Sequence, residues 1–262
     1  MGRESGVEDL TGGLGPGRRR VGVEVWIVLG LSLGRSAVYA LVELLNRLTW
    51  TPPIAEQTTA ALNSSASDRP WWDLLYQLLS IGFGLVPVVL ALYLLGGSPR
   101  AVLARIGLNL ARPGRDLAWS LALAAAIGVP GLGVYALGRV AGINLSVMVS
   151  DLGAHWWTVP VLILAALKNG LAEEVVVVAY LVTRLEQLRW RPWAVLAATA
   201  LLRGGYHLYQ GFGMFLGNAV MGLVFAQFYR RTRRVAPLVA AHALIDIVSF
   251  VGPSFIPIDW LP

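Results

Sequence analysis

The chain has 262 residues, of which 56% are hydrophobic and only 14% are charged, with a mean hydropathy of +0.64 and a net charge of +6. Soluble domains carry about 25% charged residues, so this composition excludes an ordinary soluble domain and predicts an integral membrane protein. The lack of cysteine excludes disulfide bonds, a thiolate nucleophile and a cysteine metal site.

The elements are predicted in chain order from the length of the apolar stretches. Residues 1–20 are polar and glycine-rich, which predicts a disordered cytoplasmic tail. A bilayer core needs about 20 apolar residues per helix, so residues 21–252 predict an all-α membrane bundle of about seven transmembrane helices, followed by a short tail over 253–262. The predicted helices are Val21–Leu48, Trp72–Leu95, Leu117–Ala141, Val159–Leu185, Ala194–Tyr209, Phe212–Tyr229 and Pro237–Val251.

Three local patterns modify this set of helices. Ser98–Arg115 mixes valine, leucine and isoleucine with arginine, which predicts an amphipathic helix on the cytoplasmic face of the membrane. Pro130 lies between glycines in the third helix and predicts a kink. The pair Gly204–Gly205 predicts that the fifth helix is broken or tilted.

The placement of arginine predicts the orientation of the helices. Arginines gather in alternate connections, whereas Thr49–Trp71 holds only Arg69 and Asn144–Thr158 holds none. Because cytoplasmic loops carry the excess of positive charge, we expect a multi-pass protein of the cell membrane with its N-terminus in the cytoplasm and its C-terminus outside. Tryptophans at the expected helix ends, such as Trp72 and Trp156, fit the aromatic belt of membrane interfaces.

The most informative residues are two consecutive carboxylates, Glu173 and Glu174, inside the apolar stretch Leu162–Leu181. A charge at membrane depth costs roughly 3 kcal/mol on insertion scales, so such residues mark functional sites by default. Consecutive helix residues point about 100° apart, so both carboxylates are not expected to face the same atom. One can act as a general base on a reacting water while the other pairs elsewhere. The alternative is a structural ion pair between helices.

Two histidines lie on later predicted helices. Arg203 and His207 are four residues apart and share a helix face, and His242 and Asp246 have the same spacing. An aspartate can accept the ring N–H of a histidine and fix its tautomer, and it can help to position a water or an oxyanion. A lone histidine in a helix is more often a core residue, but the nearby arginine and acids favour a buried hydrolytic site.

These motifs resemble the CPBP family of intramembrane proteases, which includes the CAAX endopeptidases and the Abi bacteriocin-immunity proteins. The family carries Glu-Glu-x-x-x-Arg on one helix, Phe-x-x-x-His on a later helix and His-x-x-x-Asn/Asp on the last. The chain shows the core of these motifs in the same order, and the resemblance covers about residues 159–251.

The resemblance implies a role for each motif residue. Glu173 would activate water for attack on a peptide carbonyl, and Glu174 would orient or neutralise nearby charge. His207 would help to bind the water or the carbonyl. His242 and Asp246 would stabilise the oxyanion, a task that typically contributes about 3–4 kcal/mol for each donor.

Two positions depart from the family pattern. Val178 stands where the family motif has arginine, and Arg203 stands four residues before His207, where the family has phenylalanine. A buried carboxylate that lacks its partner is strongly destabilising. We therefore expect Arg203 to replace the missing cation as a supporting residue and to pair with Glu174 from the neighbouring helix. The same departures leave open a non-proteolytic function.

The leading prediction is an intramembrane endopeptidase that acts on a membrane-associated or lipid-modified peptide or protein. Its partners would be that substrate and the lipid bilayer, with no nucleic acid. Two other classes stay open: a non-catalytic scaffold or bacteriocin-immunity protein on the same fold, and a proton-coupled transporter. Either no cofactor is required, or one zinc ion is held by Glu173, His207 and His242. The lack of a His-Glu-x-x-His motif favours chemistry without a metal.

Overall fold

The protein is described by a computed structural model that covers residues 16–59 and 61–254. The described chain is helical, with β-pairing only as isolated bridges between connecting loops. The α-helices are α1 (Pro16–Gly30), α2 (Leu33–Leu48), α3 (Pro70–Gly84), α4 (Val86–Leu95), α5 (Pro99–Arg105), α6 (Pro113–Val140), α7 (Thr158–Glu173), α8 (Leu181–Gln187), α9 (Pro192–Tyr206), α10 (Phe212–Thr232) and α11 (Ala236–Val251). A π-helical segment, η2 (Glu174–Tyr180), joins α7 to α8, and short 3₁₀ turns occupy Ile54–Glu56, Leu208–Gln210 and Gly252–Ser254.

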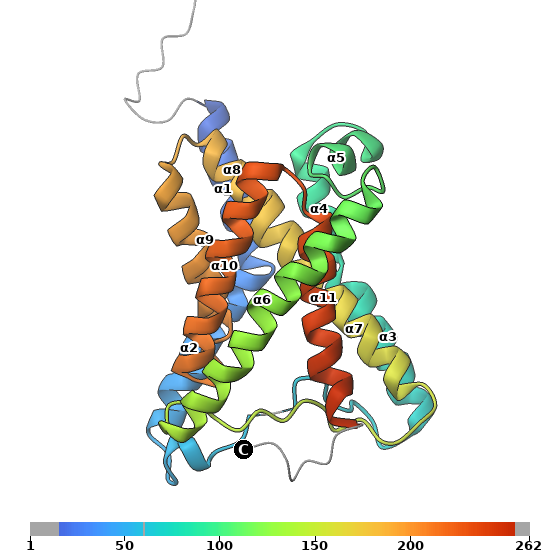
Figure 1. Ribbon diagram of the computed structural model, residues 1–262, viewed down its shortest axis with the longest axis vertical. Helices are drawn as coiled ribbons and strands as arrows, with labels where there is room; N and C mark the ends of the chain where they lie inside the picture. Colours follow the sequence, from blue (N-terminus) through green and yellow to red (C-terminus); the bar gives the residue numbers. More distant parts are fainter. Residues whose placement is uncertain (1–15, 60, 255–262) are drawn as a thin grey trace, which may run out of the picture.

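The predicted all-α class is confirmed, and each predicted helix corresponds to one helix or to consecutive helices (Figure 1). Val21–Leu48 is the pair α1 and α2, which bend by 52° at the break between them. Trp72–Leu95 is α3 and α4, which meet at Leu85. Val159–Leu185 is a continuous helical path through α7, η2 and α8. Proline occupies the first turn of many helices. A backbone N–H in that turn has no intrahelical partner, so its absence in proline removes no hydrogen bond from the helix.

Several predicted boundaries are wrong. The helix α1 begins at Pro16, so residues 16–20 do not belong to the predicted tail. The rest of that tail lies outside the described residues, as does nearly all of the tail predicted for 253–262. The pair Gly204–Gly205 does not break α9, which continues to Tyr206, and a tilt of this helix stays a prediction. The helix α6 runs through Pro130 without a break, and the kink predicted at this proline also stays a prediction.

The predicted amphipathic helix Ser98–Arg115 is also wrong in length, because α5 ends at Arg105. Gly107 then takes a φ of +68° and packs against the backbone of the α10–α11 connection. A Cβ atom there would lie 2.5 Å from the carbonyl oxygen of Arg233, and Gly107 accepts a hydrogen bond from the backbone N–H of Ala236. This contact turns the chain away from a helix and toward the start of α6.

Three helical segments in the described part of the chain are long and apolar enough to cross a membrane, and a fourth is added if the bent pair α1–α2 counts as one span. The three are Pro70–Leu95, α6 and α10. The helices α7, α9 and α11 have only 15 or 16 residues each. The protein is therefore a multi-pass membrane protein, while the prediction of about seven crossings stays a prediction.

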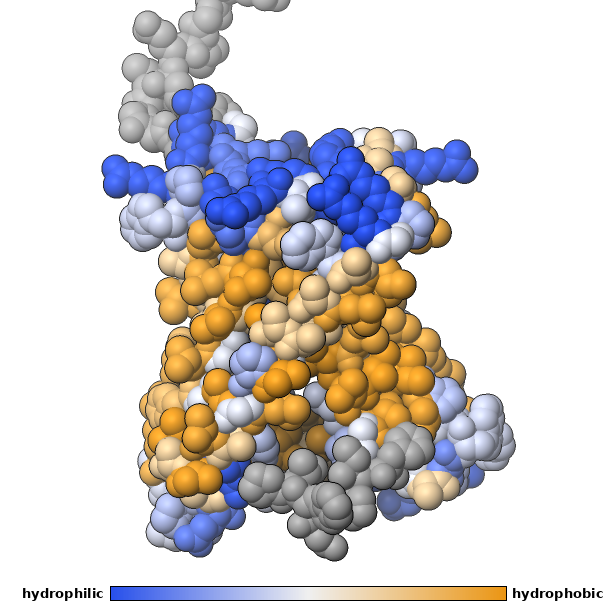
Figure 2. Space-filling model, viewed as in Figure 1, coloured by the Kyte–Doolittle hydropathy of each residue, from blue (hydrophilic) through white to orange (hydrophobic). Residues whose placement is uncertain are grey.

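The surface has an apolar middle and a strongly hydrophilic end (Figure 2). The hydrophilic end carries α5, α8 and the start of α1, where arginines pair with acids from other helices. Arg184 Nη2 lies 2.9 Å from Glu24 Oε2, and Arg230 Nε lies 3.0 Å from Glu186 Oε1. The arginine-rich connections, which alternate along the sequence with connections poor in arginine, thus gather at one end of the bundle.

Close helix packing brings the central polar residues together. At Gly170 of α7, a Cβ atom would lie 2.9 Å from the carbonyl oxygen of Val239 in α11. At Gly222 of α10, a Cβ atom would lie 3.0 Å from the Cα of Ala200 in α9. Only glycine permits these approaches, because a Cβ at either position would require the neighbouring backbone to shift.

Candidate active site

The two glutamates lie where the helix changes type. Glu173 ends α7 and Glu174 begins η2, all of whose residues are buried. Single π-helical segments within α-helices occur frequently at functional sites, because the wider turn changes which side chains face a cavity. The diglutamate is thus held in the interior of the bundle, on a segment of irregular helix.

Glu174 is fully buried, and among the described residues only one of its two carboxylate oxygens has polar partners. Its Oε1 lies 2.7 Å from Nη1 of Arg203 and 2.8 Å from Nδ1 of His242. The pairing of Arg203 with Glu174, expected from the valine at position 178, is therefore present. Val178 is itself buried among apolar residues. Within the described residues, Oε2 of Glu174 has no hydrogen-bond partner.

The two carboxylates reach different nitrogens of the same side chain, in agreement with the expectation that they do not face the same atom. Nη2 of Arg203 lies 3.4 Å from Oε2 of Glu173, while Nη1 of the same guanidinium contacts Glu174. A planar guanidinium presents several N–H donors in a fixed fork, so it can span two carboxylates that point in different directions. Arg203 is fully buried, and its position on α9 faces the end of α7.

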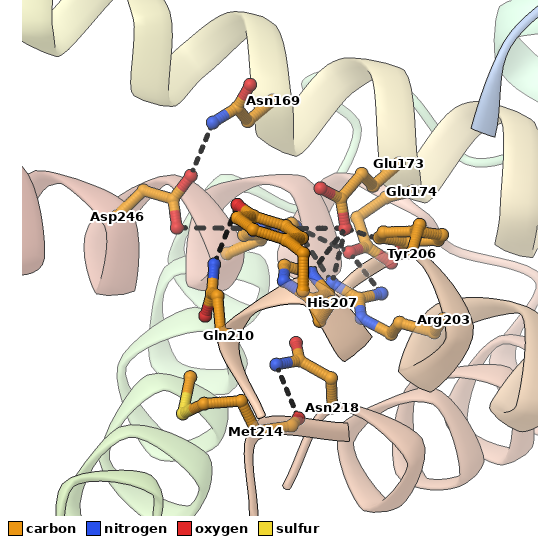
Figure 3. Close-up of polar contacts among 12 residues, drawn as sticks. Asn169, Glu173, Glu174, Arg203, Tyr206, His207, Gln210, Met214, Asn218 and Asp246 are labelled. Carbon is orange, nitrogen blue, oxygen red and sulfur yellow. Dashed lines mark hydrogen bonds and ion pairs between the residues drawn. The ribbon is translucent and has the colours of Figure 1, made fainter. Parts of the chain in front are cut away.

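Oε2 of Glu173 points toward Tyr206 and His207 (Figure 3) and also lies near a nitrogen of His242. The hydroxyl of Tyr206 donates a hydrogen bond of 2.6 Å to Oε2 of Glu173. The same oxygen lies 3.8 Å from Nε2 of His207 and 4.0 Å from Nε2 of His242. Both gaps are too long for a direct hydrogen bond, and a contact across such a gap can be made through a bridging water.

His207 follows the last residue of α9, at the start of a 3₁₀ turn. Among the residues that the structure describes, neither ring nitrogen of His207 has a hydrogen-bond partner, although both are buried. Buried polar atoms without partners are rare in native proteins and call for an explanation in terms of function or of bound water. The third histidine, His155, stacks on Trp157 in a loop and takes no part in this cluster.

Asp246 closes the cluster on the side of α11. Its Oδ1 lies 3.6 Å from Nε2 of His242, one turn earlier on the same helix. The amide of Asn169 donates a hydrogen bond of 3.0 Å to Oδ2 of Asp246. The aspartate is therefore held from α7 while it faces the histidine.

The structure brings every predicted site residue into one cluster: Glu173, Glu174, Arg203, His207, His242 and Asp246. Sequence reasoning missed Tyr206 and gave no site role to Asn169. Tyr206 lies three residues after Arg203, a spacing that shares a helix face, and this was the available signal. Asn169 lies four residues before Glu173 on α7, a spacing that also places two residues on one helix face.

The cluster as arranged does not fit a zinc ion. No group of three His, Cys, Asp or Glu side chains within residues 16–59 and 61–254 is arranged to hold a metal. Zinc lies about 2.0–2.2 Å from nitrogen and oxygen ligands in a tetrahedron. The guanidinium of Arg203, 3.4 Å from Oε2 of Glu173, adds a permanent positive charge where a cation would have to bind.

Residues 155–248 match the sequence model of a protein family described as Rce1-like, type II CAAX prenyl endopeptidase. This range contains α7 to α10 and most of α11, and with them every residue of the cluster. No protein of curated function and no solved structure matches the chain. The family recognised from the three motifs is confirmed for this domain.

Proposed function

We propose that this chain, whose residues 155–248 form a domain of the Rce1-like type II CAAX prenyl endopeptidase family, is an intramembrane endopeptidase. Its substrate would be a membrane-associated or lipid-modified peptide or protein. The arginine-rich end of the bundle would face the cytoplasm, with the N-terminus there and the C-terminus outside.

The place that a bridging water would take beside Oε2 of Glu173 carries this proposal. One carboxylate oxygen and two imidazole nitrogens surround it at separations that suit a bridging water. A water held there would have a base on one side and nitrogen groups on the other. A purely structural ion network has no need for such a position.

The chemistry follows from these contacts. Glu173 would take a proton from the water as the water oxygen attacks the peptide carbonyl, and would later give that proton to the leaving amine. His207 would hold the water or the carbonyl. His242, oriented by Asp246, would stabilise the oxyanion through a ring N–H. In the low-polarity interior, each of these interactions is stronger than it would be in water.

Glu174 and Arg203 would support the catalytic residues through their contacts with His242. Nδ1 of His242 contacts both Glu174 and Arg203, and it can serve only one of them at a time. A carboxylate accepts only, so the contact of 2.8 Å with Glu174 favours a proton on Nδ1. The pair would thereby set the orientation of the ring, and Nε2, which faces Asp246, would carry the second proton that is donated to the oxyanion.

A non-catalytic scaffold or immunity protein is the second candidate, and the observation in its favour is Val178 in place of the family arginine. A site that had lost its function would tolerate the loss of this cation. The ion pair from Arg203 to Glu174 weakens that argument, because the charge is supplied from another helix.

The test is cleavage of a membrane peptide library by purified protein in lipid vesicles. The wild type and Glu173→Gln are compared, each with and without a chelator. Cleavage by the wild type that is lost in Glu173→Gln, at equal abundance and fold, is the expected result, and the chelator is expected to leave it unchanged. Loss of cleavage with the chelator would instead restore the zinc alternative. No cleavage by folded wild type would favour the scaffold.

A further inference from the structure

His207 is not held in place by hydrogen bonds of its own side chain. Among the described residues, neither of its ring nitrogens has a hydrogen-bond partner, and its ring lies against that of Tyr206 with 4.8 Å between the two centroids. A hydrogen bond fixes distance and angle within narrow limits, whereas the contact between two rings does not. The distance of 3.8 Å from Nε2 of His207 to Oε2 of Glu173 therefore depends on the backbone that carries the histidine.

That backbone is a short turn between α9 and α10. His207 follows the last residue of α9, the 3₁₀ turn Leu208–Gln210 comes next, and Gly211 precedes α10 with a φ of +111°. Within the turn, the N–H of Gln210 donates to the carbonyl of His207, and the N–H of Gly211 donates to that of Leu208. Because only three residues separate His207 from Gly211, a displacement of one end of the turn is carried to the other.

The α6–α7 connection (residues 141–157) holds this turn. It runs along the end of the bundle opposite the hydrophilic end (Figure 1). The N–H of Leu145 donates a hydrogen bond of 3.1 Å to the carbonyl of Gln210, and the N–H of Phe212 donates one of 3.1 Å to the carbonyl of Ile143. Both residues of the connection in these bonds precede the matched family domain. The turn beside His207 is thus tied to a segment outside that domain.

Asn144 reinforces this link with its side chain, which is fully buried. Its Oδ1 accepts a hydrogen bond of 2.9 Å from the backbone N–H of Gly213, and its Nδ2 donates one of 3.3 Å to the carbonyl of Tyr135 in α6. Gly213 lies in the first turn of α10, where a backbone N–H has no partner within its own helix, so Asn144 supplies the acceptor. One amide thereby connects the end of α6 to the start of α10.

Three glycines leave the room that Asn144 occupies. A Cβ atom at Gly138 of α6 would overlap the side-chain amide of Asn144. A Cβ atom at Gly211 would lie 2.7 Å from Cα of Asn144, and one at Gly213 would lie 2.7 Å from its Oδ1. In a close-packed interior, each of these positions requires glycine as long as Asn144 stays in place. Glycines from α6, from the turn and from α10 therefore form a socket that fits this one side chain.

We propose that Asn144 is a positioning residue for His207 and sets the distance from the imidazole to Glu173 through the turn Leu208–Gln210. This inference rests on the proposed function, in which His207 holds the water or the carbonyl. Asn144 acts through backbone hydrogen bonds and not by contact with the reacting atoms. The segment that precedes the matched family domain thus contributes to the reaction without supplying a catalytic group.

Loss of the Asn144 amide is expected to slow the chemical step and to leave substrate binding nearly unchanged. A misplacement of about 1 Å can lower a rate by roughly 100-fold, so kcat per folded molecule should fall by roughly 10- to 100-fold while KM changes little. A smaller folded fraction also lowers an apparent kcat. The position of His207 must therefore be observed directly, beside the kinetics.

The experiment uses the three histidines of the chain as reporters. The full chain is labelled with heavy nitrogen in its histidine rings alone and purified without a histidine tag, so that the NMR signals come from His155, His207 and His242 only. Signals are recorded in lipid nanodiscs for wild type, Asn144→Ala and Gly213→Ala, and the His207→Leu protein assigns those of His207. Values of kcat and KM for one membrane peptide are measured on the same preparations.

Two matched controls change the same residue types away from the turn. Asn63→Ala removes another amide of the connecting loops, which donates a hydrogen bond of 3.1 Å to a loop carbonyl. Gly217→Ala adds a methyl group to α10 one turn after Gly213, where the nearest side chain would lie at an ordinary contact distance of 3.7 Å. Gly213→Ala displaces the amide of Asn144 from the opposite side, so it decides the question if Asn144→Ala does not fold.

The signals of His207 are expected to move in Asn144→Ala and Gly213→Ala, together with the fall in kcat, and to keep their positions in both controls. Unchanged His207 signals in a folded variant, or a shift without any fall in kcat, would overturn the inference while leaving the proposed function in place. Equal shifts of all three histidines would indicate a general effect on the fold and would also overturn it. If the His207 signals move as expected but the wild type cleaves no peptide, the positioning is supported and the proteolytic function is contradicted.

Discussion

The hydrophilic end of the bundle and the central cluster both bring acids and arginines together, but they use their polar atoms differently. Both carboxylate oxygens of Glu24, of Glu186 and of Asp116 accept from arginine. In the cluster, by contrast, Oε2 of Glu174 and both nitrogens of His207 lack partners among the described residues.

This difference distinguishes a structural network from a site. At the hydrophilic end, the acids join α1 to α8, α8 to α10, and α6 to the α10–α11 connection, and their hydrogen-bonding capacity is used for that purpose. In the cluster, buried groups are held without partners, which lowers stability and leaves them available to a ligand. Four substitutions can break or sharpen this comparison.

The largest effect is expected from Arg203→Leu. It leaves Glu174 buried without its cation, which should lower the free energy of unfolding by about 3–5 kcal/mol. Protein abundance and the midpoint of thermal unfolding measure this loss. Adding Val178→Arg, which restores the family motif, should recover abundance and activity. A double variant as unstable as the single one would show that Arg203 does not replace the motif arginine.

His207→Leu is expected to separate activity from stability. Neither ring nitrogen has a partner in the described structure, so the substitution removes no hydrogen bond that stabilises the fold. The midpoint of thermal unfolding should stay the same or rise, while the rate of peptide cleavage should fall by roughly 100-fold or more. His155→Leu, outside the cluster, is the control for activity. Full activity of His207→Leu would remove this histidine from the site.

Gly170→Ala tests the packing that brings α7 and α11 together. The added methyl group would lie 2.9 Å from the carbonyl oxygen of Val239, so the helices must separate. The expected cost is about 1–3 kcal/mol in the free energy of unfolding, with slower cleavage because His242 moves away from Glu174. Gly131→Ala in α6 is the matched control, since its Cβ would meet open space. Equal behaviour of the two variants would contradict the packing argument.

The smallest effect is expected at the hydrophilic end. Glu186→Gln removes the ion pairs with Arg230 and Arg233, which are partly exposed. Such pairs contribute about 1 kcal/mol or less, so a small fall in thermal stability and an unchanged cleavage rate per folded molecule are expected. A large loss of activity would mean that the two networks are coupled.

The sequence predicted the fold class and the members of the cluster well, because each depended on residue types that are expensive in a membrane. Glu173 and Glu174 could not be placed in an apolar stretch without partners, and Arg203 was expected to replace the cation that Val178 removes from the family motif. Val178 and Arg203 are therefore sufficient to predict the pairing of Arg203 with Glu174.

Other features depended on contacts between distant segments. The end of α5 is set by Gly107 against the α10–α11 connection, a contact that local sequence does not reveal. The continuity of α9 through Gly204 reflects packing against Phe215 of α10, and this contact outweighs the low helix propensity of glycine. The π-helical segment at Glu174 likewise has no signature in a run of valines.

Hydrolysis in heavy-oxygen water tests the central claim most directly, namely that a reacting water binds between Glu173 and the two histidines. A membrane peptide is incubated with purified wild-type protein in such water, and the products are weighed by mass spectrometry. Direct hydrolysis predicts one heavy oxygen in the newly formed C-terminal carboxylate, and no product from Glu173→Gln. Intact peptide in both reactions, or a product formed equally by Glu173→Gln, would contradict the account.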